Sequence, residues 1–128
     1  MPANNPKNTG TIDLSEGQGR TRVTLEANAI GQDLIICIYN DSPHMGAVAM
    51  GEYDFEHQRA SVSVMTRLGH KDDALAQSCA HDVSRSTHKP VCVIAGVHLD
   101  DITLDEIKLI QSNTHLLVER FLSQYPLS

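Results

Sequence analysis

A nearly continuous apolar run at residues 34–40, LIICIYN, constrains the fold more than any other feature of the sequence. A run of β-branched and aliphatic residues without polar alternation is typical of a strand that is covered on both faces. Residues 91–97, VCVIAGV, form a second run of this type. The chain has 128 residues, which is enough for one domain with one hydrophobic core. We therefore expect a single domain built around central apolar strands.

Three further segments are predicted to be strands. Residues 20–30 and 59–68 alternate apolar and polar side chains, which is the pattern of a half-buried strand. Residues 45–54 carry small residues beside Val48, which suits a strand that another backbone or a ligand approaches closely. Because only short turns separate the first four strands, we expect each of them to pair with the next as a hairpin.

The pattern becomes helical after residue 68. Leu75, Cys79 and Val83 recur every four residues, following an aspartate at position 72 or 73 that can cap a helix. The second helix is predicted over residues 103–124. It opens with Thr103 and Glu106 at capping-box spacing. Its predicted core face consists of Ile107, Ile110, Thr114, Leu117, Val118 and Phe121.

The predicted fold class is therefore α+β, with the element order ββββαβα: an antiparallel β meander with two helices laid on the sheet. Residues 1–19 are expected to be a flexible N-terminal tail with room for one short strand. Residues 20–128 are expected to form the single domain.

Composition restricts the function classes. Ten Lys and Arg against 16 Asp and Glu give a formal net charge of −6, which argues against nonspecific binding of nucleic acid. The three cysteines, Cys37, Cys79 and Cys92, lie in apolar stretches without metal-type spacing and favour a reducing compartment. No stretch approaches the roughly 20 apolar residues of a membrane span, and no signal region is present. We therefore expect a cytoplasmic protein that binds neither membrane nor nucleic acid.

Three histidines are predicted to meet at one end of the domain. If the strand at residues 34–40 runs upward, His44 lies at its upper end, and following the chain places His70 and His98 at the same end. The N-termini of both helices lie there too. Free backbone N–H groups and a partial positive charge make helix N-termini suitable for an oxygen-rich anion.

Two kinds of site fit these residues. A phosphate near the first helix could be contacted by Gly69, His70 and Lys71. Alternatively, a divalent metal could be held by His44, His70 and His98, with Asp72 or Asp100 supplying oxygen, because neutral imidazoles are good metal ligands. The residue spacing leaves both readings open.

Three motifs carry a resemblance to a known family: PHMGAVAM at residues 43–50, GHKDD at 69–73 and AGVHLDDIT at 95–103. In this order and spacing they resemble the LpdD-like family, prenylated-flavin chaperones associated with UbiD-type decarboxylases, over about residues 20–122. The resemblance implies a protein that binds prenylated FMN, or FMN, and helps to load or mature a partner decarboxylase acting on hydroxyaromatic acids. It implies no reaction of its own.

Carried over by position, the resemblance implies a cofactor site formed by His44, Gly46, Gly69, His70, Lys71, Asp72, His98 and Asp100. We expect the phosphate near Gly69 and Lys71, and the ring system over Gly46, Ala47 and Ala49. Met45 stands where a β-branched residue is expected, a departure that should alter packing only.

The topology also resembles proteasome-assembly-chaperone-like folds, which favours a homodimer. Leu109 and Leu116 form a second apolar face on the last helix, which indicates either a partner surface or additional burial. In a homodimer this face is the first expected interface. Two other functions remain open, a small metal-dependent enzyme with a His-rich site and a structural subunit without a small ligand. Near one equivalent of bound metal per chain would favour the enzyme.

Overall fold

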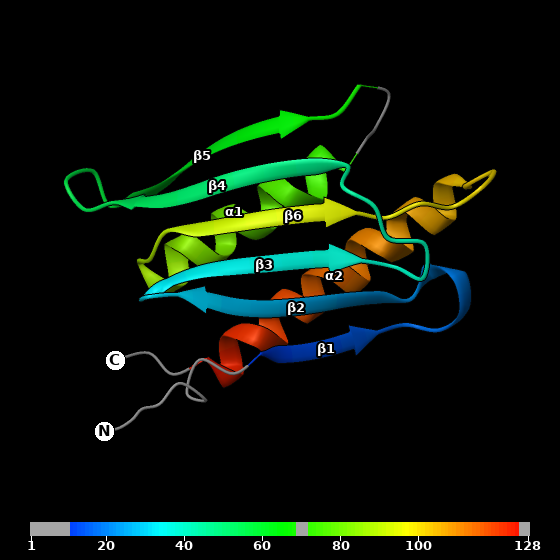
Figure 1. The fold of residues 1–128 in the computed structure, drawn as a ribbon, viewed down its shortest axis with the longest axis horizontal. Helices are drawn as coiled ribbons and strands as arrows, with labels where there is room; N and C mark the ends of the chain where they lie inside the picture. Colours follow the sequence, from blue (N-terminus) through cyan, green and yellow to red (C-terminus); the bar gives the residue numbers. More distant parts are fainter. Residues whose placement is uncertain (1–10, 69–71, 126–128) are drawn as a thin grey trace.

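The computed structural model describes residues 11–68 and 72–125. In these residues the elements are β1 (Ile12–Glu16), the 3-10 turn η2 (Gly19–Thr21), β2 (Val23–Ile30), β3 (Asp33–Tyr39), β4 (Ala47–Asp54), β5 (Arg59–Thr66), α1 (Asp73–Thr87), β6 (Val91–Gly96) and α2 (Leu104–Gln124). The described strands form one sheet in the order β1-β2-β3-β6-β4-β5 (Figure 1).

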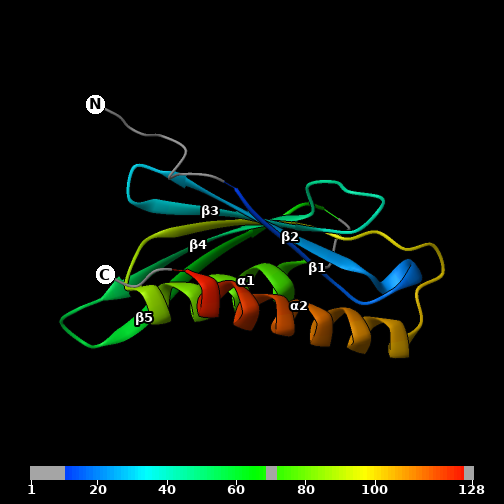
Figure 2. The same ribbon diagram turned by 90° about the horizontal axis from the view of Figure 1, so that it is seen from below.

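The two helices lie side by side on the same face of the sheet (Figure 2). α1 packs on β4, β5 and β6, whereas α2 packs on β1 and β2 and against α1. The result is a two-layer arrangement, and the predicted α+β class is confirmed. The core lies between the sheet and the helices and includes Phe121, Leu25 and Ile36, all fully buried.

The predicted meander is wrong in one respect. β6 enters the sheet between β3 and β4, pairing parallel with β3 and antiparallel with β4. Val91, Val93 and Ala95 of β6 are fully buried on the side of the sheet that the helices cover, and the central position pairs both backbone edges of the strand. The seven residues between β3 and β4 can span two strand spacings, about 10 Å, and a hairpin is therefore not required.

This insertion leaves the strand directions unchanged. β3 and β6 are parallel, and β4 is antiparallel to β6, so β4 still runs opposite to β3. The loops that follow β3 and β6 therefore leave from the same end of the sheet. This end also holds the beginning of α1, as the sequence predicts.

β1 lies within residues 1–19, where the sequence analysis allows for one short strand. It pairs antiparallel with β2 and so belongs to the sheet. The helix boundaries follow the predicted signals: α2 has a complete capping box between Thr103 and Glu106. Within the described residues, no helix is both long and apolar enough to span a bilayer.

Candidate functional site

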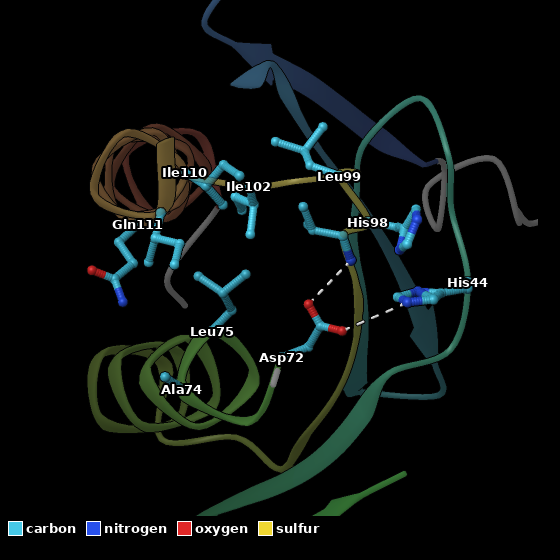
Figure 3. A pocket seen from close by; sticks show the side chains of 11 residues that line it. His44, Asp72, Ala74, Leu75, His98, Leu99, Ile102, Ile110 and Gln111 are labelled. Atoms are coloured by element: carbon cyan, nitrogen blue, oxygen red, sulfur yellow. Dashed lines mark hydrogen bonds and ion pairs between the residues drawn. The ribbon is translucent and has the colours of Figure 1, made fainter. Parts of the chain in front are cut away.

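Three loops build a pocket at the end of the sheet where β3 and β6 terminate (Figure 3). His44 comes from the β3–β4 loop, Asp72 stands at the N-cap of α1, and His98 lies between β6 and α2. The structure therefore brings together two of the three predicted histidines and the aspartate that precedes α1.

Asp72 occupies the predicted capping position, but its side chain makes no capping hydrogen bond. Its Oδ1 instead accepts from the backbone N–H of Val97 at 3.2 Å, and its Oδ2 lies 4.0 Å from Nε2 of His44. The residue is only 6% exposed. The carboxylate thus connects the start of α1 to both neighbouring loops, and it forms one wall of the pocket.

The two histidines approach each other edge to face. Their ring centroids are 5.9 Å apart, with an interplanar angle of 63°. His44 has 22% of its side chain exposed, whereas His98 has 53% exposed and its Nε2 lies 3.0 Å from Oδ1 of Asp100. Imidazole nitrogens can donate or accept according to tautomer, so this edge of the pocket can serve either polarity of ligand group.

Two glycines make the close packing around these residues possible. A Cβ at Gly46 would overlap the carboxylate of Asp72, and one at Gly96 would overlap the backbone carbonyl of His44. The backbone of Gly46 is fixed on both sides, because its N–H donates to Ala95 and its carbonyl accepts from Arg67. The three sequence motifs therefore contact one another in the fold, because Gly46 packs against Asp72 and Gly96 packs against His44.

Asn40, directly after β3, connects the two histidine loops. Its Nδ2 donates to the His98 carbonyl at 2.8 Å, and its Oδ1 accepts from the His98 N–H at 3.2 Å. The same oxygen accepts from the Ser42 N–H at 3.2 Å. At 6% exposure, the amide is buried and has both of its ends bonded.

A surface ion pair fixes the far side of the site. Arg20 donates through Nε to Glu106 at 2.6 Å and through Nη2 to the Asp100 carbonyl at 2.8 Å. The hydrogen bond from Arg20, aided by the capping N–H of Thr103, lowers the pKa of Glu106 from 4.5 to about 2. The loop that carries His98 is therefore attached to both η2 and the start of α2.

Between these loops and the helices lies a pocket of about 350 Å³. Most of its lining is aliphatic, with His44, Asp72 and His98 on one side and Gln111 on the other (Figure 3). The lining residues are His44, Asp72, Ala74, Leu75, Val97, His98, Leu99, Ile102, Ile107, Ile110 and Gln111. An apolar cavity of this size with a few convergent polar groups is typical of a site for a small molecule or cofactor.

The other expected site residues have different fates. Asp100 contacts His98 but does not line the pocket, and its side chain is 89% exposed. Gly69, His70 and Lys71 lie outside the described residues. The expected stacking of a ring over Ala47 and Ala49 is wrong, because both residues are buried in the core beneath α1, with 1% and 0% exposure.

The metal reading gains no support from the residues that can be described. Across residues 11–68 and 72–125, no group of three or more His, Cys, Asp or Glu side chains is arranged to hold a metal ion. His70, the third ligand of that hypothesis, lies in the gap between these ranges.

Sequence reasoning missed most of the pocket wall. Ile107 was expected in the core, but it is 37% exposed and faces the pocket. The sequence did contain a signal for part of this wall. Loop residues are usually exposed to solvent, so three aliphatic residues in the loop before the second helix, Val97, Leu99 and Ile102, indicate an apolar surface there. Asn40 gave a weaker one, as the first polar side chain after a fully apolar strand.

Comparisons with known proteins agree with the observed fold and with the motifs. A sequence model described as a prenylated flavin chaperone LpdD-like domain matches residues 17–126. A chain from the crystal structure of a chaperone complex for yeast 20S proteasome assembly superposes with a TM-score of 0.56 at 14% identity, covering 88% of this chain and 93% of that one. At this identity the likeness concerns the fold alone. The search of curated proteins finds no match.

Proposed function

The chain belongs to the prenylated flavin chaperone LpdD-like family, and we propose that it is a noncatalytic chaperone that binds prenylated FMN and helps to load or mature a UbiD-type decarboxylase acting on hydroxyaromatic acids. The observation that carries this proposal is the family match over residues 17–126, which includes every residue of the pocket. In such a role the flavin is cargo, and its chemistry is carried out in the decarboxylase.

The size and polarity of the pocket suit the ring system of the proposed ligand. A volume of about 350 Å³ lies near the lower end of the range of small-molecule sites, and aliphatic walls suit a fused ring system. Each helix contributes aliphatic side chains to the lining, Leu75 from α1 and Ile107 from α2. Their role would be to exclude water from the ring, while the polar side with Asp72 and the histidines would accept or donate hydrogen bonds at its edge.

The phosphate needs a separate position. The lining residues, all of them within the described part of the chain, include no Lys or Arg, and the Asp72 carboxylate on the pocket wall would repel a phosphate inside the pocket. We therefore propose that the phosphate lies outside the pocket, at the start of α1, held by backbone N–H groups together with Gly69, His70 and Lys71.

Asp72 caps this helix start without a side-chain hydrogen bond, because its carboxylate is directed to Val97 and His44 instead. Ala74 and Leu75, in the first turn of α1, line the pocket. The start of α1 is therefore next to the pocket, which supports this position for the phosphate.

A loading experiment tests the chaperone role. The protein, preincubated with anaerobically prepared prenylated FMN, is mixed with a UbiD-type decarboxylase that lacks flavin, and the two are separated by size. We expect the flavin absorbance to move to the decarboxylase fraction faster than it does from free prenylated FMN. A His70→Ala, Lys71→Ala double variant should lose this advantage, with His57→Ala, Arg59→Ala at the opposite end of the sheet as the matched control.

Equal loading with and without the protein would contradict the chaperone proposal. Tight flavin binding without transfer would instead favour a storage role. We also propose, by analogy with the fold of proteasome assembly chaperones, that the protein acts as a homodimer. No observation on the described residues favours the metal-dependent enzyme as a second function.

A further inference from the structure

The face of the sheet opposite the helices carries a continuous apolar surface. Figure 2 shows α1 and α2 on one side of the sheet only. On β3, β6, β4 and β5 the residues that alternate with the helix-facing positions point to the other side. We call the resulting surface the open-face patch, and it consists of Ile35, Cys37, Val48, Met50, Met65, Cys92 and Ile94.

Strand register makes this patch contiguous. Ile94 on β6 is paired with Cys37 on β3 and with Val48 on β4, and Cys92 is paired in the same way with Ile35 and Met50. Met65 on β5 is paired with Val48. Paired residues project to the same side of a sheet, so the seven side chains cover four adjacent strands without a charged residue among them.

The residues at the margins of the patch are polar. Glu26 is paired with Cys37 on one side, and Ser63 with Met50 on the other. Further along β4, Glu52 is exposed and paired with Ser61. An uncharged apolar centre surrounded by polar side chains is the composition expected for a protein interface.

The sequence itself indicates that this face is covered. The runs at β3 and β6 are apolar on both sides, which is typical of strands buried on both faces, yet the helices cover only one. Met50 and Met65 remain 53% and 72% exposed. Neither value suits a surface that faces solvent permanently.

We propose that the open-face patch is the surface through which two copies of this chain pair, sheet against sheet. The strands have five to eight residues and are up to about 25 Å long, and six of them span about 24 Å. The whole open face, of which the patch covers four strands, therefore offers at most about 600 Å² before side-chain relief. This upper value is at the lower end of standard interfaces, which bury about 600–1,000 Å² per partner. Two apolar sheets can pack face to face, as in β-sandwiches, and a twofold axis lets the same uncharged centre serve both partners.

The chain's own N-terminal segment suits this face less well. Residues 1–10, MPANNPKNTG, contain one large apolar side chain, Met1, and therefore cannot match seven apolar residues. The expected interface at Leu109 and Leu116 on α2 lies in the opposite layer of the molecule. The two candidate interfaces can thus be separated by single substitutions.

The test compares Met50→Glu with Leu109→Glu, a matched pair because the two side chains are 53% and 50% exposed and a folded monomer should tolerate either change. Sedimentation equilibrium of the full chain should give twice the chain mass of 14.0 kDa for the wild type. Met50→Glu should raise the dimer dissociation constant about a hundredfold or more, because it buries an unpaired carboxylate. Leu109→Glu should leave the constant unchanged.

Thiol labelling locates the interface independently and requires no flavin, so its outcome does not depend on the proposed cofactor. Cys37 and Cys92 lie on the open face, whereas Cys79 is 1% exposed in the core. We expect Met50→Glu to accelerate labelling of Cys37 and Cys92 while Cys79 stays unreactive.

Three results would overturn the inference: a wild type that is monomeric at high micromolar concentration, a dimer that persists in Met50→Glu, or a dimer lost only in Leu109→Glu. Thiols that become reactive only when residues 1–10 are removed would assign the face to that segment instead, and would also overturn it.

Discussion

Asn40 and His98 form a two-way amide contact, in which the Asn40 side chain both donates to the His98 carbonyl and accepts from the His98 N–H. The contact joins the loop after β3 to the loop after β6, two segments 58 residues apart in the sequence. It therefore fixes the distance between the loops that carry His44 and His98.

Replacing Asn40 with Asp should loosen this junction. A carboxylate can still accept from the His98 N–H, but it cannot donate to the His98 carbonyl, which loses its donor at a partly buried position. The free energy of unfolding should fall by about 1–3 kcal/mol, as measured by urea denaturation at neutral pH. Asn28→Asp is the control, because Oδ1 of Asn28 only accepts, from the Thr11 hydroxyl at 2.8 Å. Equal losses in the two variants would contradict a special role for Asn40.

The contact of Gly46 with Asp72 predicts a coupled pair. Gly46→Ala places a methyl group against the Asp72 carboxylate and should destabilise the fold by about 1–3 kcal/mol. In an Asp72→Ala background the same substitution should cost less, because the overlapping carboxylate is gone. A double-mutant cycle measured by thermal or urea unfolding gives the coupling energy. Additive effects would show that the glycine is needed for another reason.

The ion pair of Arg20 and Glu106 predicts how stability depends on pH. The pKa of Glu106 falls from 4.5 to about 2 in the folded protein, so its contribution is fully present above pH 4.5 and is lost as the pH falls towards 2. Glu106→Gln keeps a residue suited to the capping box but removes the charge. The stability difference between wild type and this variant should therefore shrink between pH 4.5 and 2. A difference that stays constant over that range would refute the assignment.

The aliphatic wall predicts a matched pair of binding variants. Ile107 lines the pocket at 37% exposure, whereas Leu109 is 50% exposed and lies outside the lining. Ile107→Ala should weaken binding of prenylated FMN about tenfold, because it removes apolar contact with the ring. Leu109→Ala should leave affinity unchanged, and both variants should unfold at nearly the wild-type urea concentration. Affinity is measured by absorbance or fluorescence titration under anaerobic conditions.

Local signals in the sequence were sufficient for several parts of the fold. The capping box of Thr103 and Glu106 is formed by residues three positions apart, and the alternation at Val23 and Leu25 reports one strand face directly. The position of β6 between β3 and β4 was not predictable in this way, because strand order depends on contacts between segments that are far apart in the sequence. An apolar strand has the same composition whichever strands are its neighbours.

The site was predictable to the extent that strand direction fixes loop position. His44, Asp72 and His98 meet because the strands that precede them, β3, β5 and β6, all terminate at the same end of the sheet. The pocket wall was not predictable. Helical periodicity indicates which residues share a face of the helix, but it does not distinguish a face that packs in the core from a face that lines a pocket. Ile107 and Ile110 share such a face, yet only Ile110 is buried, at 4% exposure.

The most direct test of the central claim, that prenylated FMN occupies the pocket between the histidine loops and the helix N-termini, is an anaerobic titration of isotope-labelled protein followed by amide NMR signals. We predict saturation at one flavin per chain, with the largest shifts at Leu75, Val97 and Ile107 and none at Gly31 in the β2–β3 turn at the other end of the sheet. Absence of binding, or shifts centred away from these lining residues, would contradict the claim.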